Sequence, residues 1–503
     1  MAAAPNLLFV IADQWRAGAL GCTGRDPVLT PALDELAGRA RVLTDAVSNY
    51  PVCSPCRGML MTGLYPHRNG VPFNVNSATA PEVGLRPETP CWSDVLSDAG
   101  YALGYIGKWH LEAPVEDDAS YGEGRRDDGK VWDAYTPPAH RHGFDFWYSH
   151  GCCDDHARPH YWVRGAAREE VLRVEQWSAE HETDVAVDYL RTAARRYHEQ
   201  GQPFALVLSY NPPHQPFDQV PERYRVHYQR REPRDLLPSP NVEWGNRAAA
   251  EAVEVAPLYY AAITGVDEQF GRLLTALDDQ GLMNDTIVVF TSDHGMQLGS
   301  HGLVYKNVPY EESMRVPFLI SWPGHVAPGA DDLLLSSPDV APTLLGLLGQ
   351  SARRPPQMQG RDLSDQLLVG ITAGGGPDPA RPGAALYIGP GHDVLRLDVR
   401  GLRTHTHKLI VEAPPGGPLR RQLFDLAVDP YELADVADDQ PDVLASLAEL
   451  LCHELDRIGD PWPGRRIIQE ELAAVGPARP PEHARPSAST GPPVIPSHGK
   501  STA

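Results

Sequence analysis

The chain has 503 residues and is acidic: 44 lysine and arginine residues stand against 66 aspartate and glutamate residues, a formal net charge of −22. This length allows roughly three average domains, or one large α/β core with a smaller unit. The negative charge argues against a surface for nucleic acid or for an anionic membrane, so an anionic substrate would need a local basic pocket.

The first residues predict a strand and not a targeting segment. Residues 1–5 carry no basic region and lead at once into the apolar run Leu7 to Ala12, so we expect a cytoplasmic enzyme. No apolar stretch approaches the ~20 residues of a membrane span. The seven cysteines are scattered and odd in number, which is typical of reduced thiols and not of a disulfide framework.

Apolar runs of strand length alternate with helical patterns along the first two thirds of the chain. Strands are expected at 7–12, 42–47, 102–106, 204–209, 286–291 and 316–321, and helices at 31–39, from Cys53 onward, and at 93–99, 183–200, 258–277 and 340–348. Continuous apolar runs are typical of parallel strands covered on both faces. The alternation predicts a large, mostly parallel, doubly wound α/β sheet flanked by helices.

A change of composition divides the chain. Residues 349–383 are rich in Pro, Gly and Arg and resemble a linker, and short strands are expected after them at 385–388, 394–402 and 408–412, with a helix at 442–458. We therefore expect a catalytic α/β domain at 1–376, a smaller α+β subdomain on an antiparallel sheet at 377–476, and a disordered tail at 477–503. The irregular stretches 112–165 and 219–246 are interpreted as long loops that face substrate.

One stretch, residues 51–63, places a cysteine at the expected start of a helix. Cys53 precedes Pro55 and Arg57, and the unpaired N–H groups of a helix N-terminus together with the Arg57 guanidinium favour an anionic group. Three other interpretations compete: a buried packing thiol, a redox dithiol with Cys56, and half of a zinc site. Cys152 and Cys153 are adjacent and do not supply the second pair that zinc needs.

Polar residues follow several of the expected strands. Asp13 and Gln14 follow the first strand, Lys108 and His110 a later one, and Asp293 and His294 another, with His214 and Lys306 on further loops. Each alone is a weak signal. The ends of parallel strands converge on one crevice, so together they predict one site.

The motifs around these residues resemble those of the sulfatase family. The pattern Cys53-x-Pro55-x-Arg57, followed by Leu60, Met61, Thr62 and Gly63, is similar to the sulfatase signature. The resemblance continues at 100–110, 213–216, 293–295, 306–317 and 422–435. The chain departs from the commonest pattern at Cys56, where the family usually carries Ser, Thr or Ala, and this leaves a Cys53–Cys56 disulfide open.

The resemblance implies that Cys53 is oxidised to formylglycine (3-oxoalanine), whose hydrate carries two hydroxyls on one carbon. One hydroxyl can attack sulfur and the other can later expel sulfate. It also implies one divalent cation bound by Asp13, Gln14, Cys53 as formylglycine, Asp293 and His294. Many members have Asp at position 14 and Asn at position 294, so Ca²⁺ is the family default and Mn²⁺ or Mg²⁺ becomes more credible.

The resemblance further implies a role for each remaining residue. Arg57 would hold the hydrate, Lys108 and Lys306 would neutralise the sulfate oxygens, and His110 would act as the base that expels sulfate. His214, with Lys306, would protonate the leaving alcohol.

The function implied is hydrolysis of an aryl or carbohydrate sulfate ester, with a formylglycine-generating enzyme as maturation partner. The nearest rival is a phosphonate monoester or phosphodiester hydrolase of the same superfamily. Lys108 and His110 argue against that rival, because those relatives tend to carry neutral residues in this block. A non-catalytic or redox protein with unmodified Cys53 is the alternative from another class.

Overall fold

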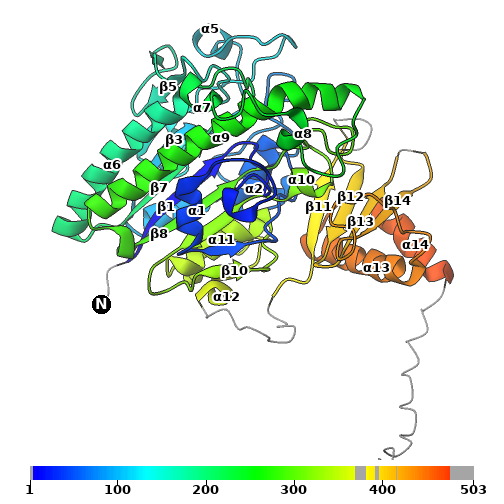
Figure 1. The fold of residues 1–503 in the computed structure, drawn as a ribbon. Coiled ribbons are helices and arrows are strands. Elements are labelled where there is room, and N and C mark those ends of the chain that lie inside the picture. The colour runs from blue at the N-terminus through cyan, green and yellow to red at the C-terminus, as the bar shows by residue number, and fades with distance from the viewer. Residues whose placement is uncertain (1–3, 369–380, 391–395, 415, 476–503) are drawn as a thin grey trace, which may run out of the picture.

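The computed structural model describes residues 4–368, 381–390, 396–414 and 416–475. The expected domain boundary at 376/377 and the tail at 477–503 lie outside the described residues. Among the described helices, none is both long and apolar enough to cross a membrane. Two sheets lie side by side, a large one in the first two thirds of the chain and a small one near its C-terminal end (Figure 1).

The large sheet has ten strands in the order β10-β2-β9-β8-β1-β7-β3-β4-β5-β6. Its centre is parallel: β8, β1, β7, β3 and β4 run the same way, whereas β9 and β5 pair with their neighbours in antiparallel fashion. The bounds are β1 Asn6–Ala12, β2 Arg41–Leu43, β3 Ala102–Lys108, β4 Phe146–His150, β5 His160–Val163, β6 Leu172–Arg173, β7 Phe204–Tyr210, β8 Thr286–Ser292, β9 Phe318–Ser321 and β10 Gly329–Asp331. The expected α/β class is confirmed.

Both faces of the sheet are covered, which is why its central strands are apolar throughout. Along β1, Leu7 and Phe9 enter one hydrophobic core, whereas Leu8 and Val10 enter the other, as the twofold alternation of a strand requires. The first core lies under α2, α4 and α11 and the second under α1, α6 and α9. The main helices are α1 Pro31–Ala37, α2 Cys53–Thr62, α4 Trp92–Asp98, α6 Ser178–Gln200, α9 Arg247–Asp279 and α11 Ser337–Leu347.

The stretch 112–165 departs from the expectation of loops alone. It contains β4 and β5, which extend the main sheet, and the short helix α5 Asp118–Tyr121. The sequence of β4, Phe-Trp-Tyr-Ser-His, is not a continuous aliphatic run. Its strand conformation is fixed by pairing with β3, since Gly104 to Lys108 lie opposite Phe146 to His150. The stretch 219–246 likewise contains short helices, α7 Glu222–Arg225 and α8 Pro233–Leu236.

The small sheet is antiparallel in the order β11-β12-β13-β14, as expected for an α+β unit. Its strands are β11 Ala385–Gly389, β12 Val399–Arg403, β13 His407–Glu412 and β14 Arg420–Asp425, and its helices are α13 Pro441–Ile458 and α14 Gly464–Val475. Leu386, Leu409 and Leu451 belong to the same buried cluster as Leu7 and Phe9 of the large sheet. The two units therefore share one continuous core.

The remaining short helices lie in connections: α3 Pro66–Asn69, α10 Glu311–Met314, α12 Ser364–Leu368, and the 3-10 turns Gly21–Thr23, Pro138–His140, Met283–Asp285 and Ser351–Arg353. Among them, α10 follows the loop that carries Lys306 and leads back into the main sheet at β9. This loop contacts both units: Asn307 N donates to the carbonyl oxygen of Pro51 at 3.1 Å, and Lys408 Nζ of the small sheet donates to that of Pro309 at 2.9 Å.

Candidate active site

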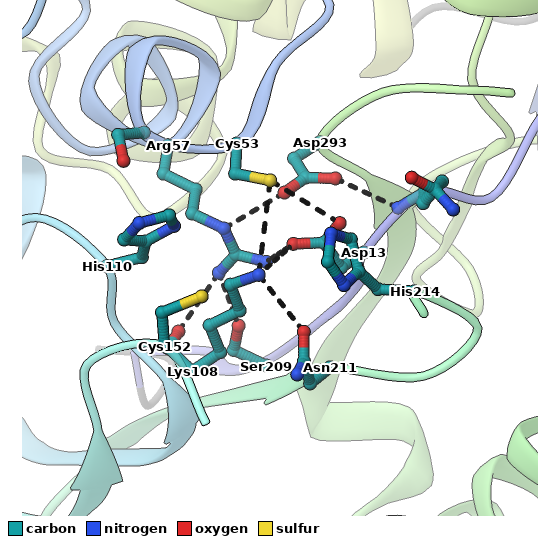
Figure 2. A network of polar contacts seen from close by, with 12 residues as sticks. Asp13, Cys53, Arg57, Lys108, His110, Cys152, Ser209, Asn211, His214 and Asp293 are labelled. Carbon is teal, nitrogen blue, oxygen red and sulfur yellow. Dashed lines mark hydrogen bonds and ion pairs between the residues drawn. The ribbon is translucent and has the colours of Figure 1, made fainter. Parts of the chain in front are cut away.

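The carboxyl ends of four adjacent parallel strands meet at one place (Figure 2). β1 ends before Asp13, β3 ends in Lys108, β7 is followed by Asn211, and β8 is followed by Asp293. All four side chains are buried. Three of them, Asp13, Lys108 and Asp293, were expected from the sequence and are brought together, as the rule for open α/β sheets predicts.

Cys53 is the first residue of α2 and is 2% exposed. Its Sγ lies 3.4 Å from Nε2 of His294, 3.6 Å from Oδ1 of Asp13 and 3.6 Å from Nζ of Lys306. Nζ of Lys108 is 3.9 Å away. Figure 2 shows the thiol directed at Asp13 and Lys108.

The charges around Cys53 favour an anion there. Burial and the Asp13 carboxylate both oppose ionisation of the thiol, but Lys108, Lys306 and His294 outweigh them and lower the pKa of Cys53 to about 6. A buried position that still stabilises negative charge is suited to bind an anionic group.

Arg57 lies one turn along α2 and is fully engaged by the protein. Its Nε donates to Asp293 at 2.9 Å and its Nη2 to Asp13 at 3.2 Å. Nη1 donates to Ser209 Oγ at 2.7 Å and to the carbonyl oxygen of Lys108 at 2.9 Å. Burial acts against its charge, but Asp293 and Asp13 raise the pKa of Arg57 above its usual range. Arg57 therefore fixes both carboxylates beside Cys53.

The expected metal ligands face one another. Asp13, Cys53, Asp293 and His294 each offer a ligand atom, and these atoms lie within 4.8 Å of one another. Gln14 has its backbone at φ 68°, in the left-handed region. Its Oε1 is buried and meets no hydrogen-bond partner in the described part of the chain. Two carboxylates, an imidazole and an orphaned amide oxygen fit a divalent cation.

The ammonium groups of two lysines lie close to the Cys53 thiol. Lys108 Nζ donates to Asp13 at 2.7 Å and to Asn211 Oδ1 at 3.0 Å. Burial disfavours the ammonium group, but Asp13, Cys152 and Cys53 raise the pKa of Lys108 above its usual range. Lys306 is held more loosely, with its Nζ 3.9 Å from Asp13. Both lysines are thus placed to meet an anion bound at Cys53.

Two histidines complete the site. His110 stands at φ 53°, and its Nε2 lies 3.1 Å from the carbonyl oxygen of Val75, which leaves Nδ1 without a partner among the described residues. Burial lowers the pKa of His110, and the neighbouring Cys53 opposes this only in part. Burial, with Lys306 and Lys108, also lowers the pKa of His214 below its usual value. Figure 2 shows His214 next to Asp13, on the opposite side of the thiol from His110.

Three contacting residues were not singled out from the sequence: Ser209, Asn211 and Asp154. Ser209 and Asn211 lie at the end of β7, so the same strand-end rule could have found them. Asp154 accepts a hydrogen bond from Asn211 Nδ2 at 3.2 Å. It lies in the stretch interpreted as loops, where no spacing pattern pointed to it.

Cys56 does not join Cys53 in a disulfide. Both thiols are free in the structure. Sγ of Cys56 lies 3.4 Å from Ser337 Oγ, at the start of α11. Burial and the nearby Asp293 raise the pKa of Cys56 to about 12, opposite to the shift at Cys53. Within one helix, one thiol faces the charged site and the other is a packing residue.

Comparison with known proteins identifies the family of this chain. The model of the family described as Sulfatase matches residues 5–350, and that described as N-sulphoglucosamine sulphohydrolase, C-terminal, matches residues 299–458. The chain belongs to the sulfatase family. It is a sulfuric ester hydrolase with the α/β fold and C-terminal antiparallel sheet of that family.

Two curated sulfatases and one solved structure give the scale of the similarity. An Endo-4-O-sulfatase of Bacteroides thetaiotaomicron is 38% identical over 93% of this chain and 95% of its own length. An ulvan-active sulfatase of Formosa agariphila is 33% identical over 85% of this chain and 76% of its own length. A Bacteroides thetaiotaomicron structure solved in work on the metabolism of multiple glycosaminoglycans has a TM-score of 0.84 and 37% identity, and covers 93% of this chain and 99% of that one.

Proposed function

We propose that this sulfatase hydrolyses a sulfate ester of a saccharide with formylglycine, made from Cys53, as its nucleophile. The observation that carries the proposal is the position of Cys53. Its side chain starts a helix and lies within 4 Å of Asp13, His294 and two lysines. A side chain in this place touches the cation ligands and the sulfate-binding cations at once.

The residues that would hold the cation are Asp13, Gln14, Asp293 and His294, together with the modified side chain of residue 53. The donor set of oxygens with one nitrogen is compatible with Ca²⁺, Mg²⁺ or Mn²⁺. When bound, the cation lowers the proton affinity of a hydroxyl on residue 53, which makes that hydroxyl a usable nucleophile. Arg57 keeps Asp13 and Asp293 in place through its two carboxylate contacts.

Lys108 and Lys306 bind the non-bridging oxygens of the sulfate group. Both ammonium groups already face Cys53 before substrate arrives, and Asp13 and Asn211 hold Lys108 in its position. Charges that are fixed in advance need no reorganisation as negative charge develops, and this is usually the largest contribution to catalysis.

The two histidines move protons on opposite sides of residue 53. His214, with the nearby Lys306, supplies the proton of the leaving alcohol. The pKa of His214 is lowered in the free site, so it acts as the acid once the bound sulfate anion raises that pKa and both ring nitrogens carry a proton. His110 takes the proton of the second hydroxyl of residue 53 when sulfate departs. A lowered pKa keeps His110 neutral near pH 7, as a base must be.

The substrate class is drawn from the relatives and from charge. The relatives named above include an Endo-4-O-sulfatase and an ulvan-active sulfatase, and we extend their class of substrate, a sulfated saccharide, to this chain. With a net charge of −22, the protein attracts such an anion only through local groups such as Lys108 and Lys306.

Formylglycine requires a maturation partner, and we propose a formylglycine-generating enzyme that acts on Cys53 before the chain folds. Burial supports this order, because Cys53 is 2% exposed in the folded protein. A catalyst that must reach the thiol needs the segment in an extended form.

Parallel assays test the proposal. Purified protein co-expressed with a maturation enzyme is given an aryl sulfate, a phosphate diester, a phosphonate monoester and sulfated oligosaccharides, each with and without added Ca²⁺ or Mg²⁺. We expect sulfate release from the sulfate esters to exceed hydrolysis of the phosphorus esters by at least tenfold. Preferred hydrolysis of the diester or of the phosphonate would establish the rival function.

A further inference from the structure

Asp154 lies at the wall of the active site, in the loop between β4 and β5, and the mechanism above assigns it no role. Its carboxylate is 16% exposed and divides its two oxygens between two different groups. One oxygen faces the residues that follow β7. The other faces Arg126, which comes from an earlier loop of the same wall.

On the active-site side, Oδ1 of Asp154 contacts two residues of the β7 exit. It accepts a hydrogen bond from Asn211 Nδ2 at 3.2 Å and lies 3.6 Å from Nδ1 of His214. Asn211 in turn accepts from Lys108 Nζ at 3.0 Å. Asp154 is therefore one residue removed from a sulfate-binding lysine and in contact with the proposed proton donor.

On the outer side, Oδ2 of Asp154 is anchored. It lies 2.7 Å from Nη1 of Arg126, which also donates to Glu123 at 2.8 Å and to the carbonyl oxygen of Cys152 at 2.7 Å. The backbone N–H of Asp154 donates to Glu123 at 2.6 Å. A carboxylate with its backbone and one oxygen both fixed cannot swing away from His214 without breaking an ion pair.

The orientation of His214 determines what such an anchor does. His214 Nδ1 lies 2.7 Å from the carbonyl oxygen of Gln215, so this nitrogen carries the proton of the neutral ring. When a bound sulfate anion favours the imidazolium, Nε2 carries the second proton and is the nitrogen that can donate it to the leaving alcohol. The carbonyl oxygen of His214 accepts from His156 Nε2 at 2.9 Å. The ring is thus held by its backbone from one side and by the acceptors Gln215 and Asp154 from the other.

We propose that Asp154, anchored by Arg126, is a positioning residue that aims His214 at the leaving-group oxygen and Asn211 at Lys108. The inference rests on the proposed function, since it assumes that His214 protonates the departing alcohol. It adds a specific consequence. Displacing Asp154 damages proton donation to the leaving group more than it damages attack on sulfur.

The dependence of rate on the leaving group tests this. A series of aryl sulfates is used, from p-nitrophenyl sulfate, whose phenol leaves without help, to phenyl sulfate and a less acidic leaving group. For Asp154→Ala we expect kcat to fall about 10-fold to 100-fold for the poorest leaving group and less than about threefold for p-nitrophenyl sulfate. The plot of log kcat against leaving-group pKa becomes steeper than in the wild type.

Two further variants make the experiment decisive. Arg126→Gln leaves Asp154 in place but removes its anchor, and it should give the same steepening at smaller amplitude even where Asp154→Ala folds poorly. Asp155→Ala is the matched control: its Oδ1 accepts from Arg158 N at 2.9 Å, and its side chain is 35% exposed. We expect it to leave the slope unchanged.

An equal loss for every leaving group, or no loss, in both Asp154→Ala and Arg126→Gln would overturn the inference while the proposed function stands. A wild-type protein that releases sulfate neither from the aryl sulfates nor from sulfated oligosaccharides would overturn both.

Discussion

Two buried ionic clusters of this sulfatase differ in how completely their charges are paired. Where α10 meets the small sheet, Lys408 Nζ lies 2.8 Å from Glu311 and 2.7 Å from Glu432. Arg403 also pairs with Glu311, at 3.2 Å. At the active site, Lys306 has its nearest carboxylate only at 3.9 Å. The first cluster joins two units of the fold. The second has a lysine without a close carboxylate partner.

The difference shows in what each cluster does to an acidic group. Burial raises the pKa of Glu311, but Arg403 and Lys408 outweigh it and lower that pKa below its usual range. At the active site, the excess of cations instead lowers the pKa of Cys53, which is not one of the carboxylates that pair with them. Removing one member of a balanced buried set leaves a charge uncompensated, which is costly, whereas a set with excess positive charge can bind an anion.

The largest effect is expected at Cys53. Cys53→Ala removes the precursor of the nucleophile, so turnover should fall by at least about 10³-fold, measured as sulfate release, while the far-UV circular dichroism stays that of the wild type. Cys56→Ser is the matched control in the same helix, and it should retain activity within a few-fold. Activity of Cys53→Ala comparable to the wild type would exclude a nucleophile at residue 53.

Breaking the balanced cluster should cost stability. Lys408→Met leaves Glu311 and Glu432 buried with less compensation, because Lys408 is 1% exposed and contacts both. We expect the free energy of unfolding to fall by about 3 to 5 kcal/mol in urea titrations. Arg420→Ala, which removes an exposed pair with Glu412, should change it by less than about 1 kcal/mol. If Lys408→Met and Arg420→Ala lost similar unfolding free energy, the buried cluster would be no more important for stability than an exposed ion pair.

Breaking the unbalanced cluster should cost rate instead. Lys306→Ala removes a cation that faces residue 53 without a close carboxylate, so kcat should fall by about 10² to 10³-fold. The midpoint of urea unfolding should not fall, because no tight ion pair is lost. A variant that lost stability but kept its kcat would assign Lys306 to the fold.

Glu182 is a buried carboxylate that has no lysine or arginine beside it in the described part of the chain. In the described part of the chain, the ion-pair neighbour of Glu182 is His150, at 3.8 Å. Burial raises the pKa of Glu182 from 4.5 to about 8. The folded state therefore holds a proton that the unfolded state releases above pH 4.5, and this group lowers stability as the pH rises from about 4.5 to about 8.

Glu182→Gln removes that dependence. Its unfolding free energy, compared with the wild type at pH 5 and at pH 8.5, should gain about 1 to 3 kcal/mol at the higher pH relative to the lower one. If the unfolding free energies of the two proteins changed equally between pH 5 and pH 8.5, the pKa of Glu182 would not be raised by folding.

The sequence predicted the centre of the site because local patterns determine it. Leu7 to Ala12 is a continuous apolar run, so its burial on both faces could be inferred, and Asp13 followed from its place at the strand end. The start of α2 at Cys53 was also expected. The cation set, the formylglycine and the cytoplasmic location stay predictions.

The wall of the site could not be predicted in the same way. β4 is held by pairing with β3, and Asp154 reaches Asn211 and His214 only because the loop after β4 folds back over the end of β7. Such contacts join residues more than 40 positions apart and leave no periodic signal in the sequence. The engagement of Arg57 by Asp13 and Asp293 was missed for the same reason, because it depends on where three separate elements meet.

The chemical state of residue 53 tests the central claim most directly. Mass spectrometry of the peptide that spans Cys53, from active protein of the native host, would be combined with hydroxylamine labelling of aldehydes. We predict an aldehyde at residue 53 whose fraction rises in proportion to specific activity, with Cys56 as an unmodified thiol. Fully active protein with an intact Cys53 thiol, or with a Cys53–Cys56 disulfide, would contradict it.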